Sequence, residues 1–382
     1  MNHIFFGCWN DGGCDTTTTT SNKLSEVMKL ISTNHHYQKN IIYVLGDNYY
    51  PKKNGLIPVK MYNETFFNSG FECLVNLPYE YMYVLYGNHE YDYLFENEQI
   101  LEFAKEFDKK LKSQTQSGGK LCSLTRQLPY YQRDNIYNVD IGLTKNKILL
   151  INTNVYEFTN IKVERERGKK GEKNKQKKEK FAKEKQKLAS GSCISTLSMT
   201  NIKYLQEIIL KDYITTDKDN YVICGHEPLI TIRKKGGNIV LDYHNELLQI
   251  LNIRSDKHII YICADTHYYQ HLEITLQNGV TISQYIVGTG GTKLDTPYIG
   301  ELPEEIDMPD IIRIIDNKDT RKTHGYLLSK DLKNYTFVGI DEEERAGRLN
   351  MKKKISRRKK ISRRKKRSRK KKRSRKKKII LS

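Results

Sequence analysis

Short apolar runs that stop at turn residues recur along this chain, and helix-like segments separate them. Continuous apolar runs bounded by turn residues are typical of strands that are buried on both faces of a sheet. Their alternation with helices indicates an α/β fold, and 382 residues are enough for one large core or two domains. The strand-like runs are IFFGC, IIYVLGD, YMYVLYG, KILLINT, YVICG, HIIYICAD and TISQYIVG; the helix-like segments are LSEVMKLIS, QILEFAKEFDKKL, NIKYLQEIIL and HNELLQILNI.

The net charge of +21 is concentrated in two segments. Residues 351–382 hold 21 Lys and Arg residues and no acidic residue, so residues 1–350 carry 45 basic and 45 acidic residues. The block 161–190 holds 13 basic and 5 acidic residues and few apolar ones. Segments of this composition cannot bury a core of their own. We therefore predict one domain over residues 1–345, interrupted by this low-complexity insertion, and a disordered Lys/Arg-rich tail over residues 346–382.

The tail has the charge density to bind a polyanion without reading its sequence. Lys and Arg displace counterions from nucleic acid and are also attracted to anionic membranes. Residues 351–382 contain no aromatic residue, so they offer no platform for base stacking. The alternatives are a nuclear import signal and a tail that only keeps the protein soluble. For the insertion 161–190, the two alternatives are a binding role and a spacer without a role.

Several features bear on the compartment. Seven cysteines without a repeated spacing argue against a disulfide framework and for reduced thiols. No apolar stretch approaches the roughly 20 residues of a membrane helix, and the start lacks the charged and apolar regions of a signal peptide. We therefore expect an intracellular protein, in the cytoplasm, the nucleus or a virus particle. Its many Tyr, Ile, Asn and Lys residues are typical of an AT-rich genome, such as that of a large DNA virus.

Polar residues follow directly after five of the apolar runs. Because ligands of an open α/β sheet sit at the carboxyl ends of its strands, loops at these positions can aim side chains into one crevice. Glycine lets the backbone turn sharply at four of the five ends. The five ends are Gly7-Cys8-Trp9-Asn10, Gly46-Asp47-Asn48-Tyr49-Tyr50, Gly87-Asn88-His89-Glu90, Gly225-His226-Glu227-Pro228 and Ala264-Asp265-Thr266-His267.

The side chains at these ends are those of a metal site. Carboxylate, amide, imidazole and phenolate groups suit one or two hard-to-borderline cations, and an aspartate shared between two metals holds them a few ångströms apart. Such a pair binds a bridging hydroxide and clamps a phosphoryl group during in-line attack. The sequence therefore predicts a hydrolase of phosphoesters.

The motifs resemble those of the calcineurin-like metallophosphoesterases, and within them the purple (tartrate-resistant) acid phosphatases. GDNYY at 46–50 and GNHE at 87–90 match two family motifs in full. The run from Ile223 to His226 matches a third with isoleucine in place of valine. The resemblance covers roughly residues 3 to 340, without the tail. It implies a four-layer α/β/β/α sandwich with a dinuclear site at one edge of the two sheets, binding iron together with zinc, manganese or a second iron.

The resemblance also implies a role for each matching residue. One metal would take Tyr50, His267 and the bridging Asp47, and the second would take Asp47, Asn88 and His226. His89 would orient the phosphate or protonate the leaving alkoxide. Tyr50 separates the phosphatase branch from the wider superfamily, and its binding to Fe(III) would give the purple colour of that branch.

Two positions depart from the family's motifs. Cys8 stands where the first motif has aspartate, and Asp265 stands where the last has histidine. Cys8 is either a thiolate ligand in an altered site or a small buried filler at a lost ligand position. Asp265 can replace histidine as an oxygen ligand with a shorter reach. Asp11 and Asp15 are a third, less favoured source of a replacement ligand.

These observations leave three functions open. The first is a metal-dependent phosphomonoesterase acting on a phosphorylated substrate. The second is a catalytically impaired pseudoenzyme that binds nucleic acid or an anionic surface through its tail, because one ligand differs in each metal shell. The third is a phosphodiesterase or nuclease to which the tail brings the substrate. Tyr50 favours the first.

Overall fold

The computed structural model describes about half of the chain. The described residues are 1–10, 23–48, 50, 70, 72–74, 76–85, 87–89, 120–123, 147–159, 196–216, 220–235, 238–253, 257–299 and 308–340. The expected insertion 161–190, the expected tail 346–382 and the pair Asp11 and Asp15 lie outside them. The chain divides into the units Met1–Val338 and Gly339–Ser382. The fold given below is that of the first unit.

The first of two large sheets has the strand order β14-β13-β1-β2-β3-β4. Its middle strands β1, β2, β3 and β4 are parallel, and β13 pairs antiparallel with β1. The strands are β1 (Asn2–Phe6), β2 (Asn40–Leu45), β3 (Tyr81–Leu85), β4 (Lys120–Ser123), β13 (Gly325–Ser329) and β14 (Tyr335–Gly339).

The second sheet has the strand order β12-β10-β11-β9-β6-β5. Strands β5, β6, β9 and β11 are parallel, whereas β10 pairs antiparallel with both β11 and β12. A separate two-stranded hairpin consists of β7 (Ile230–Lys235) and β8 (Asn238–Tyr243). The strands of the sheet are β5 (Leu149–Leu150), β6 (Tyr221–Cys224), β9 (His258–Cys263), β10 (Tyr269–Leu276), β11 (Thr281–Val287) and β12 (Ile312–Arg321).

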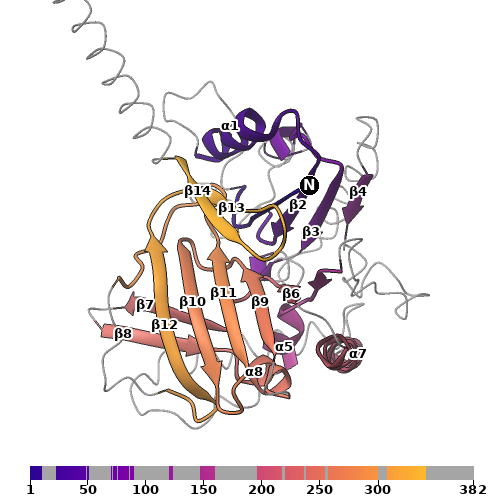
Figure 1. The fold of residues 1–382 in the computed structure, drawn as a ribbon, viewed down its shortest axis with the longest axis vertical. Coiled ribbons are helices and arrows are strands. Elements are labelled where there is room, and N and C mark those ends of the chain that lie inside the picture. The colour runs from indigo at the N-terminus through magenta and orange to yellow at the C-terminus, as the bar shows by residue number, and fades with distance from the viewer. Residues whose placement is uncertain are drawn as a thin grey trace, which may run out of the picture. The chain divides into compact units, whose positions relative to one another are not determined.

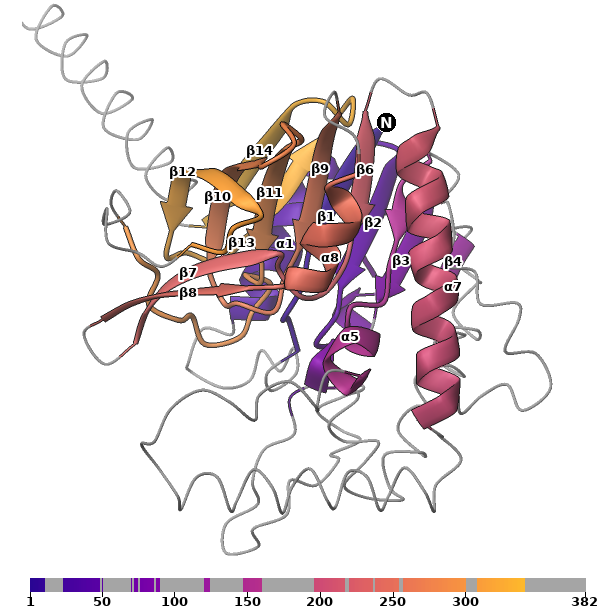
Figure 2. The ribbon, with the colours of Figure 1, turned by 90° about the horizontal axis from the view of Figure 1, so that it is seen from below.

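The two sheets enclose the hydrophobic core between them. Successive side chains of a strand point to opposite faces of its sheet. Phe5 and Tyr43 of the first sheet therefore share one buried cluster with Ile260 and Ile262 of the second. The alternate residues of β1 and β2 are also fully buried, so the outer face of the first sheet is covered as well. Figures 1 and 2 show the two sheets as separate layers.

Helices supply the outer layers. The helix α1 (Lys23–His35) contacts the outer face of the first sheet, where its last residue hydrogen-bonds to Tyr326 of β13. On the second sheet, α7 (Thr196–Thr215) packs Tyr213 edge-on against Tyr221 of β6. Figure 2 shows α7 and α8 (Asn245–Leu251) in front of the second sheet. The short α5 (Asn154–Thr159) follows β5. The predicted α/β sandwich of four layers is confirmed.

The expectation of reduced thiols is only partly correct. Cys8, Cys224 and Cys263 are buried and form no disulfide bond. Cys73, however, is disulfide-bonded, so the expectation was wrong for this residue. Among the described residues, no helix combines the length and the apolar character needed to cross a membrane.

Candidate metal centre

The polar strand ends meet where the two sheets abut. The amide of Cys8, after β1, donates to the Gly46 carbonyl after β2 over 3.0 Å. In the second sheet, the amide of Ala264 after β9 donates to the His226 carbonyl over 2.9 Å. The two sheets are joined by the amide of Gly7, which donates to the Val287 carbonyl over 3.1 Å. Parallel strands thus deliver their loops to one edge, as the sequence predicts.

The backbone is constrained at three of these loops. Cys8, Asp47 and Asp265 adopt φ angles of 51°, 51° and 49°, in the left-handed region that residues other than glycine rarely enter. Each lies at the point where a strand ends. Strain of this kind persists only where the surrounding structure fixes it, and it gathers at functional sites.

Two glycines leave room for the side chains of the site. A Cβ atom on Gly46, whose φ is 91°, would lie 2.4 Å from the His226 Nδ1 atom. A Cβ atom on Gly87 would lie 2.1 Å from the Asp47 Oδ1 atom. Since neither distance allows a methyl group, glycine is required at both positions for His226 and Asp47 to sit where they do.

Asp47 lies at the centre of the site, with its side chain almost fully buried. Its Oδ2 atom accepts a hydrogen bond of 2.6 Å from the Tyr50 hydroxyl and lies 3.8 Å from the Cys8 sulfur. Its Oδ1 atom accepts from the His89 amide over 3.2 Å and lies 3.2 Å from the His226 Nε2 atom. The two oxygens of one carboxylate therefore face two different sets of donors.

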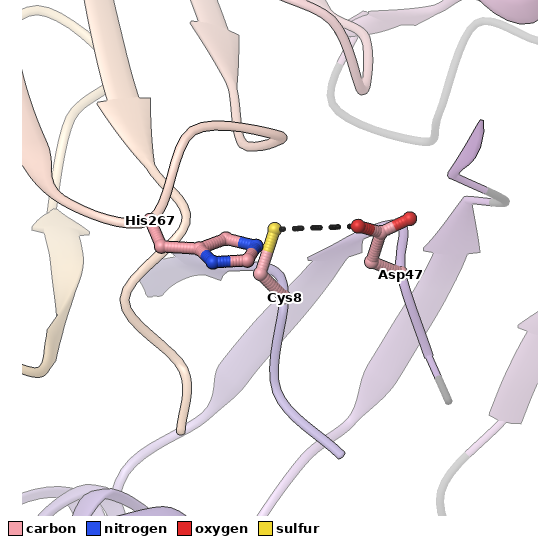
Figure 3. Close-up of side chains that lie close together, drawn as sticks. All are labelled: Cys8, Asp47 and His267. Atoms are coloured by element: carbon pink, nitrogen blue, oxygen red, sulfur yellow. Dashed lines mark hydrogen bonds between the residues drawn. The ribbon is translucent and has the colours of Figure 1, made fainter. Parts of the chain in front are cut away.

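The first set, which we call the thiol half, comprises Cys8, Asp47, Tyr50 and His267. The donor atoms of Cys8, Asp47 and His267 lie within 4.8 Å of one another, in a grouping able to hold a metal ion. Figure 3 shows the Cys8 sulfur between the imidazole of His267 and the carboxylate of Asp47. The Tyr50 hydroxyl completes the set at 3.1 Å from the His267 Nε2 atom.

The second set, the amide half, comprises Asp47, Asn88, His226 and Asp265. The His226 Nε2 atom lies 3.2 Å from the Asn88 Oδ1 atom and 3.8 Å from the Asp265 Oδ1 atom. The side chain of Asp265 remains 34% exposed, whereas that of His226 is 1% exposed. Burial raises the pKa of Asp265, against the opposing charge of His226. The predicted oxygen donor at this position thus belongs to the amide half and is its more exposed member.

Both histidines turn the same ring nitrogen toward the site. The Nδ1 atom of His226 lies 2.7 Å from the Leu45 carbonyl, and that of His267 lies 3.1 Å from the Lys293 carbonyl. A carbonyl only accepts, so each Nδ1 atom carries a proton and each Nε2 atom faces the donor sets. Metal-bound histidines almost always donate their other ring N–H to such a partner. The residues present therefore fit a pair of cations.

Protons occupy the site when no cation does. Burial disfavours the Asp47 carboxylate, but the charges of His226 and His89 and the Tyr50 hydrogen bond hold its pKa well below the usual range. Burial likewise opposes the imidazolium of His226, yet the Asp47 carboxylate raises the pKa of His226 to about 10. Burial and the neighbouring negative charges raise the pKa of the Tyr50 phenol well above its ordinary value. A cation bound by these groups would displace their protons.

His89 lies beside the donor sets. Its side chain is 25% exposed, and its Nε2 atom lies 3.9 Å from the Asp47 Oδ2 atom. Its ring centre lies 4.7 Å from that of Tyr50, with the planes inclined by 57°. This position leaves the imidazole open to solvent on one side while its backbone amide holds Asp47.

The supporting residues were not predicted from sequence. The Trp9 indole donates to the Asn48 side chain over 3.0 Å, and the Asn48 amide donates to the Leu85 carbonyl over 2.7 Å. The segment after β11 supplies the Lys293 carbonyl to His267, and the Asp295 carboxylate accepts from the His267 amide over 3.2 Å. The strand-like run TISQYIVG was the sequence signal nearest to that segment, and it does not point to either residue.

An α/β/β/α sandwich in which one buried carboxylate faces two donor sets is the architecture of a metal-dependent phosphoesterase. A family model described as calcineurin-like phosphoesterase matches residues 4–269, so the chain belongs to the calcineurin-like phosphoesterase family. The family acts on phosphoesters at a dinuclear metal site. The class of protein predicted from the motifs is thereby confirmed.

No curated protein matches the chain. Among solved structures, a purple acid phosphatase from yellow lupin (Lupinus luteus) seeds is similar, with a TM-score of 0.42 and 13% sequence identity. The match covers 89% of this chain and 52% of that one, so this chain spans about half the length of the lupin protein.

Proposed function

We propose that this protein is a metal-dependent phosphomonoesterase of the purple acid phosphatase type. The observation that carries the proposal is the carboxylate of Asp47, whose Oδ2 atom faces the thiol half and whose Oδ1 atom faces the amide half. A carboxylate in this position is suited to bridge two cations. The proposal assigns the site to two metal ions, iron together with zinc, manganese or a second iron.

The roles of the side chains follow from their places. Asp47, Tyr50 and His267 would hold one ion, and Asp47, Asn88 and His226 would hold the other. Two cations held by these residues would supply Lewis acidity and a water of lowered pKa for the attack on a phosphoryl group. The Nδ1 hydrogen bonds of the two histidines fix both rings before a substrate arrives.

His89 is the proposed catalytic acid or phosphate-orienting residue. A phosphoryl group that reaches the donor sets from solvent would meet the exposed side of its ring, since 25% of the His89 side chain is accessible. An imidazolium there can donate to a phosphoryl oxygen or pass its proton to the leaving alkoxide. Its Nε2 atom lies 3.9 Å from the Asp47 Oδ2 atom.

Tyr50 supports the phosphatase branch over the phosphodiesterases. Its hydroxyl points into the site, 2.6 Å from the Asp47 Oδ2 atom and 3.1 Å from the His267 Nε2 atom. A phenol with no role in metal binding would not need to lie between two further donors. We therefore propose a phosphomonoester as the substrate class, with residues 351–382 as a separate polyanion-binding segment.

The proposal is tested with two artificial substrates. The full chain is loaded with iron, zinc or manganese, alone and in pairs, and assayed with 4-nitrophenyl phosphate and bis(4-nitrophenyl) phosphate. Turnover of the monoester but not of the diester is expected. Faster turnover of the diester would identify a phosphodiesterase. No turnover with any metal would leave a binding module without catalysis.

A further inference from the structure

We propose that Cys8 is a thiolate ligand and that it makes the thiol half selective for a thiophilic divalent cation such as Zn²⁺. The inference rests on the proposed function in one respect, namely that the site binds metal. It goes further because it decides between the two roles of Cys8 and assigns a class of ion to one half of the site.

The geometry of the sulfur fits a ligand. With zinc–ligand bonds of about 2.0 to 2.3 Å, tetrahedral donors lie roughly 3.3 to 3.8 Å apart. The Cys8 sulfur lies 3.8 Å from the Asp47 Oδ2 atom, and the Tyr50 hydroxyl lies 3.1 Å from the His267 Nε2 atom. Cys8, Asp47 and His267 offer their donor atoms within a span of 4.8 Å. Small side-chain movements bring this set to ideal distances.

The backbone holds the thiol in this direction. The amide of Cys8 donates to the Gly46 carbonyl over 3.0 Å, and its carbonyl accepts from the amide of Thr292 over 3.2 Å. Between these bonds the residue has a φ of 51°. The left-handed conformation is unfavourable for a residue with a Cβ atom. Asp47 and Asp265, the two candidate carboxylate ligands, adopt the same conformation at their strand ends.

The surroundings of the sulfur differ from those of a structural cysteine. The Cys8 sulfur lies 3.6 Å from the Asp265 carbonyl oxygen and 3.8 Å from the Asp47 carboxylate. Cys224 is buried to the same extent as Cys8, but it lies within strand β6. A small apolar filler has no reason to face a carboxylate, a phenol and an imidazole together. A ligand does.

The two halves differ in chemical softness. The thiol half combines a thiolate and an imidazole with two oxygen donors, which is a set that suits zinc. The amide half offers the carboxylates of Asp47 and Asp265, the amide oxygen of Asn88 and one imidazole. Three oxygen donors out of four favour a harder ion such as manganese or iron. Each half therefore prefers a different cation.

Cobalt provides a readout that does not depend on activity. Co²⁺ substitutes for zinc, and its binding to a thiolate produces a sulfur-to-cobalt charge-transfer band in the near ultraviolet. The full chain is titrated with Co²⁺ alongside the variants Cys8→Ser and Cys8→Asp. Cys263→Ser is the matched control, because this buried free cysteine bonds the Tyr285 carbonyl within the second sheet. Bound cobalt is counted by mass spectrometry in each sample, and circular dichroism checks that each variant is folded.

The proposal expects the band in the wild-type chain and in Cys263→Ser, and its loss in both Cys8 variants. Cys8→Ser should also weaken zinc binding by at least 10- to 100-fold. Loss of a residue that only supports a metal ligand typically has an effect of this size, and Cys8 is proposed to be a ligand itself. Cobalt bound without the band, or a band that survives in Cys8→Ser, would overturn the thiolate assignment and leave the proposed function standing. A wild-type chain that binds no metal at all would overturn both.

Discussion

Asp47 is the residue on which the account depends. It is almost fully buried, yet it remains a carboxylate because His226 and Tyr50 lie against its two oxygens. Leaving a charge in such a place without partners costs several kcal/mol, so the neighbouring donors are a condition of its burial. Two bound cations would take over this role from the protons that otherwise occupy the site.

Replacing Asp47 with Asn tests this position directly. The amide cannot bridge two cations, so we expect kcat/KM for the monoester to fall by at least about 1,000-fold, which corresponds to ~4 kcal/mol. Bound metal should fall below two ions per chain. The control Asp319→Asn removes a partly exposed carboxylate that pairs with Arg321 on β12, and it should change neither quantity. Near-normal turnover in Asp47→Asn would rule out the dinuclear mechanism.

His3 is expected to make the protein sensitive to acid. Burial, with a smaller effect of the amino terminus, lowers the pKa of His3 to about 4. As the pH drops, His3 takes up a proton near pH 6.5 in the unfolded chain but only near pH 4 in the folded chain. The unfolded state binds more protons between these values, so stability falls as the pH drops through this window. Between pH 6.5 and pH 4 the wild-type chain should therefore lose about 3 kcal/mol more of its free energy of unfolding than the His3→Gln variant does.

Denaturant unfolding at several pH values between 6.5 and 4, at fixed metal loading, measures this difference. The exposed His36 provides the matched control, since His36→Gln removes a histidine without opening the core. Equal pH dependence in the wild type and in His3→Gln would show that His3 has no part in acid sensitivity.

At the scale of elements, the site is a property of strand ends. Loops after β1, β2 and β3 of the first sheet meet loops after β6 and β9 of the second, because both sheets place their parallel strands side by side and end them at one edge. Close approach of these loops leaves no space at Gly46 or Gly87. The loops therefore act together, and a small change in one displaces the ligands of another.

Gly87→Ala should separate the effect on the site from the effect on stability. Its Cβ atom would lie 2.1 Å from the Asp47 Oδ1 atom and 2.4 Å from the Asp47 amide nitrogen. We expect Asp47 to move, bound metal to fall below two ions per chain, and stability to fall by about 1 to 3 kcal/mol. Metal analysis beside thermal unfolding measures both.

The control is Gly279→Ala, in the turn between β10 and β11. Its φ of 91° makes alanine costly there without touching the site, so stability should fall while the metal content stays unchanged. If Gly87→Ala bound metal as well as Gly279→Ala did, the tight packing around Asp47 would not matter for the site.

Much of this arrangement could be predicted from the sequence, because continuous apolar runs mark buried parallel strands and their ends mark the site. Other parts could not. The short strand β14 lies at the edge of the first sheet with β13 beside it, and both carry a weak pattern. In β12 exposed residues interrupt the apolar pattern. The direction of the Cys8 thiol depends on a left-handed backbone conformation, which the residue types around position 8 do not predict. Asp295 reaches His267 from 28 residues away, within a loop that has no recognisable pattern.

At the scale of the whole molecule, charge and chemistry are divided between different parts of the chain. The net charge of +21 comes from the basic residues after position 350, because the preceding 350 residues carry equal numbers of acidic and basic residues. The candidate metal centre lies in the unit Met1–Val338. Binding to polyanions and turnover of a small substrate should therefore be separable.

Deleting residues 351–382 tests this separation. Turnover of 4-nitrophenyl phosphate should be unchanged, because no candidate site residue is removed. Retention on heparin, and its decrease with salt, should largely disappear, because 21 basic residues are lost. A truncated chain that still elutes from heparin at the salt concentration of the full chain would place the polyanion-binding surface elsewhere.

The most direct measurement of the central claim is the metal content of the full chain, purified without chelator and analysed by mass spectrometry. The account predicts two ions per chain, one in each of the two donor sets that share Asp47. A chain that holds no metal, even after reconstitution with iron, zinc and manganese, would contradict it.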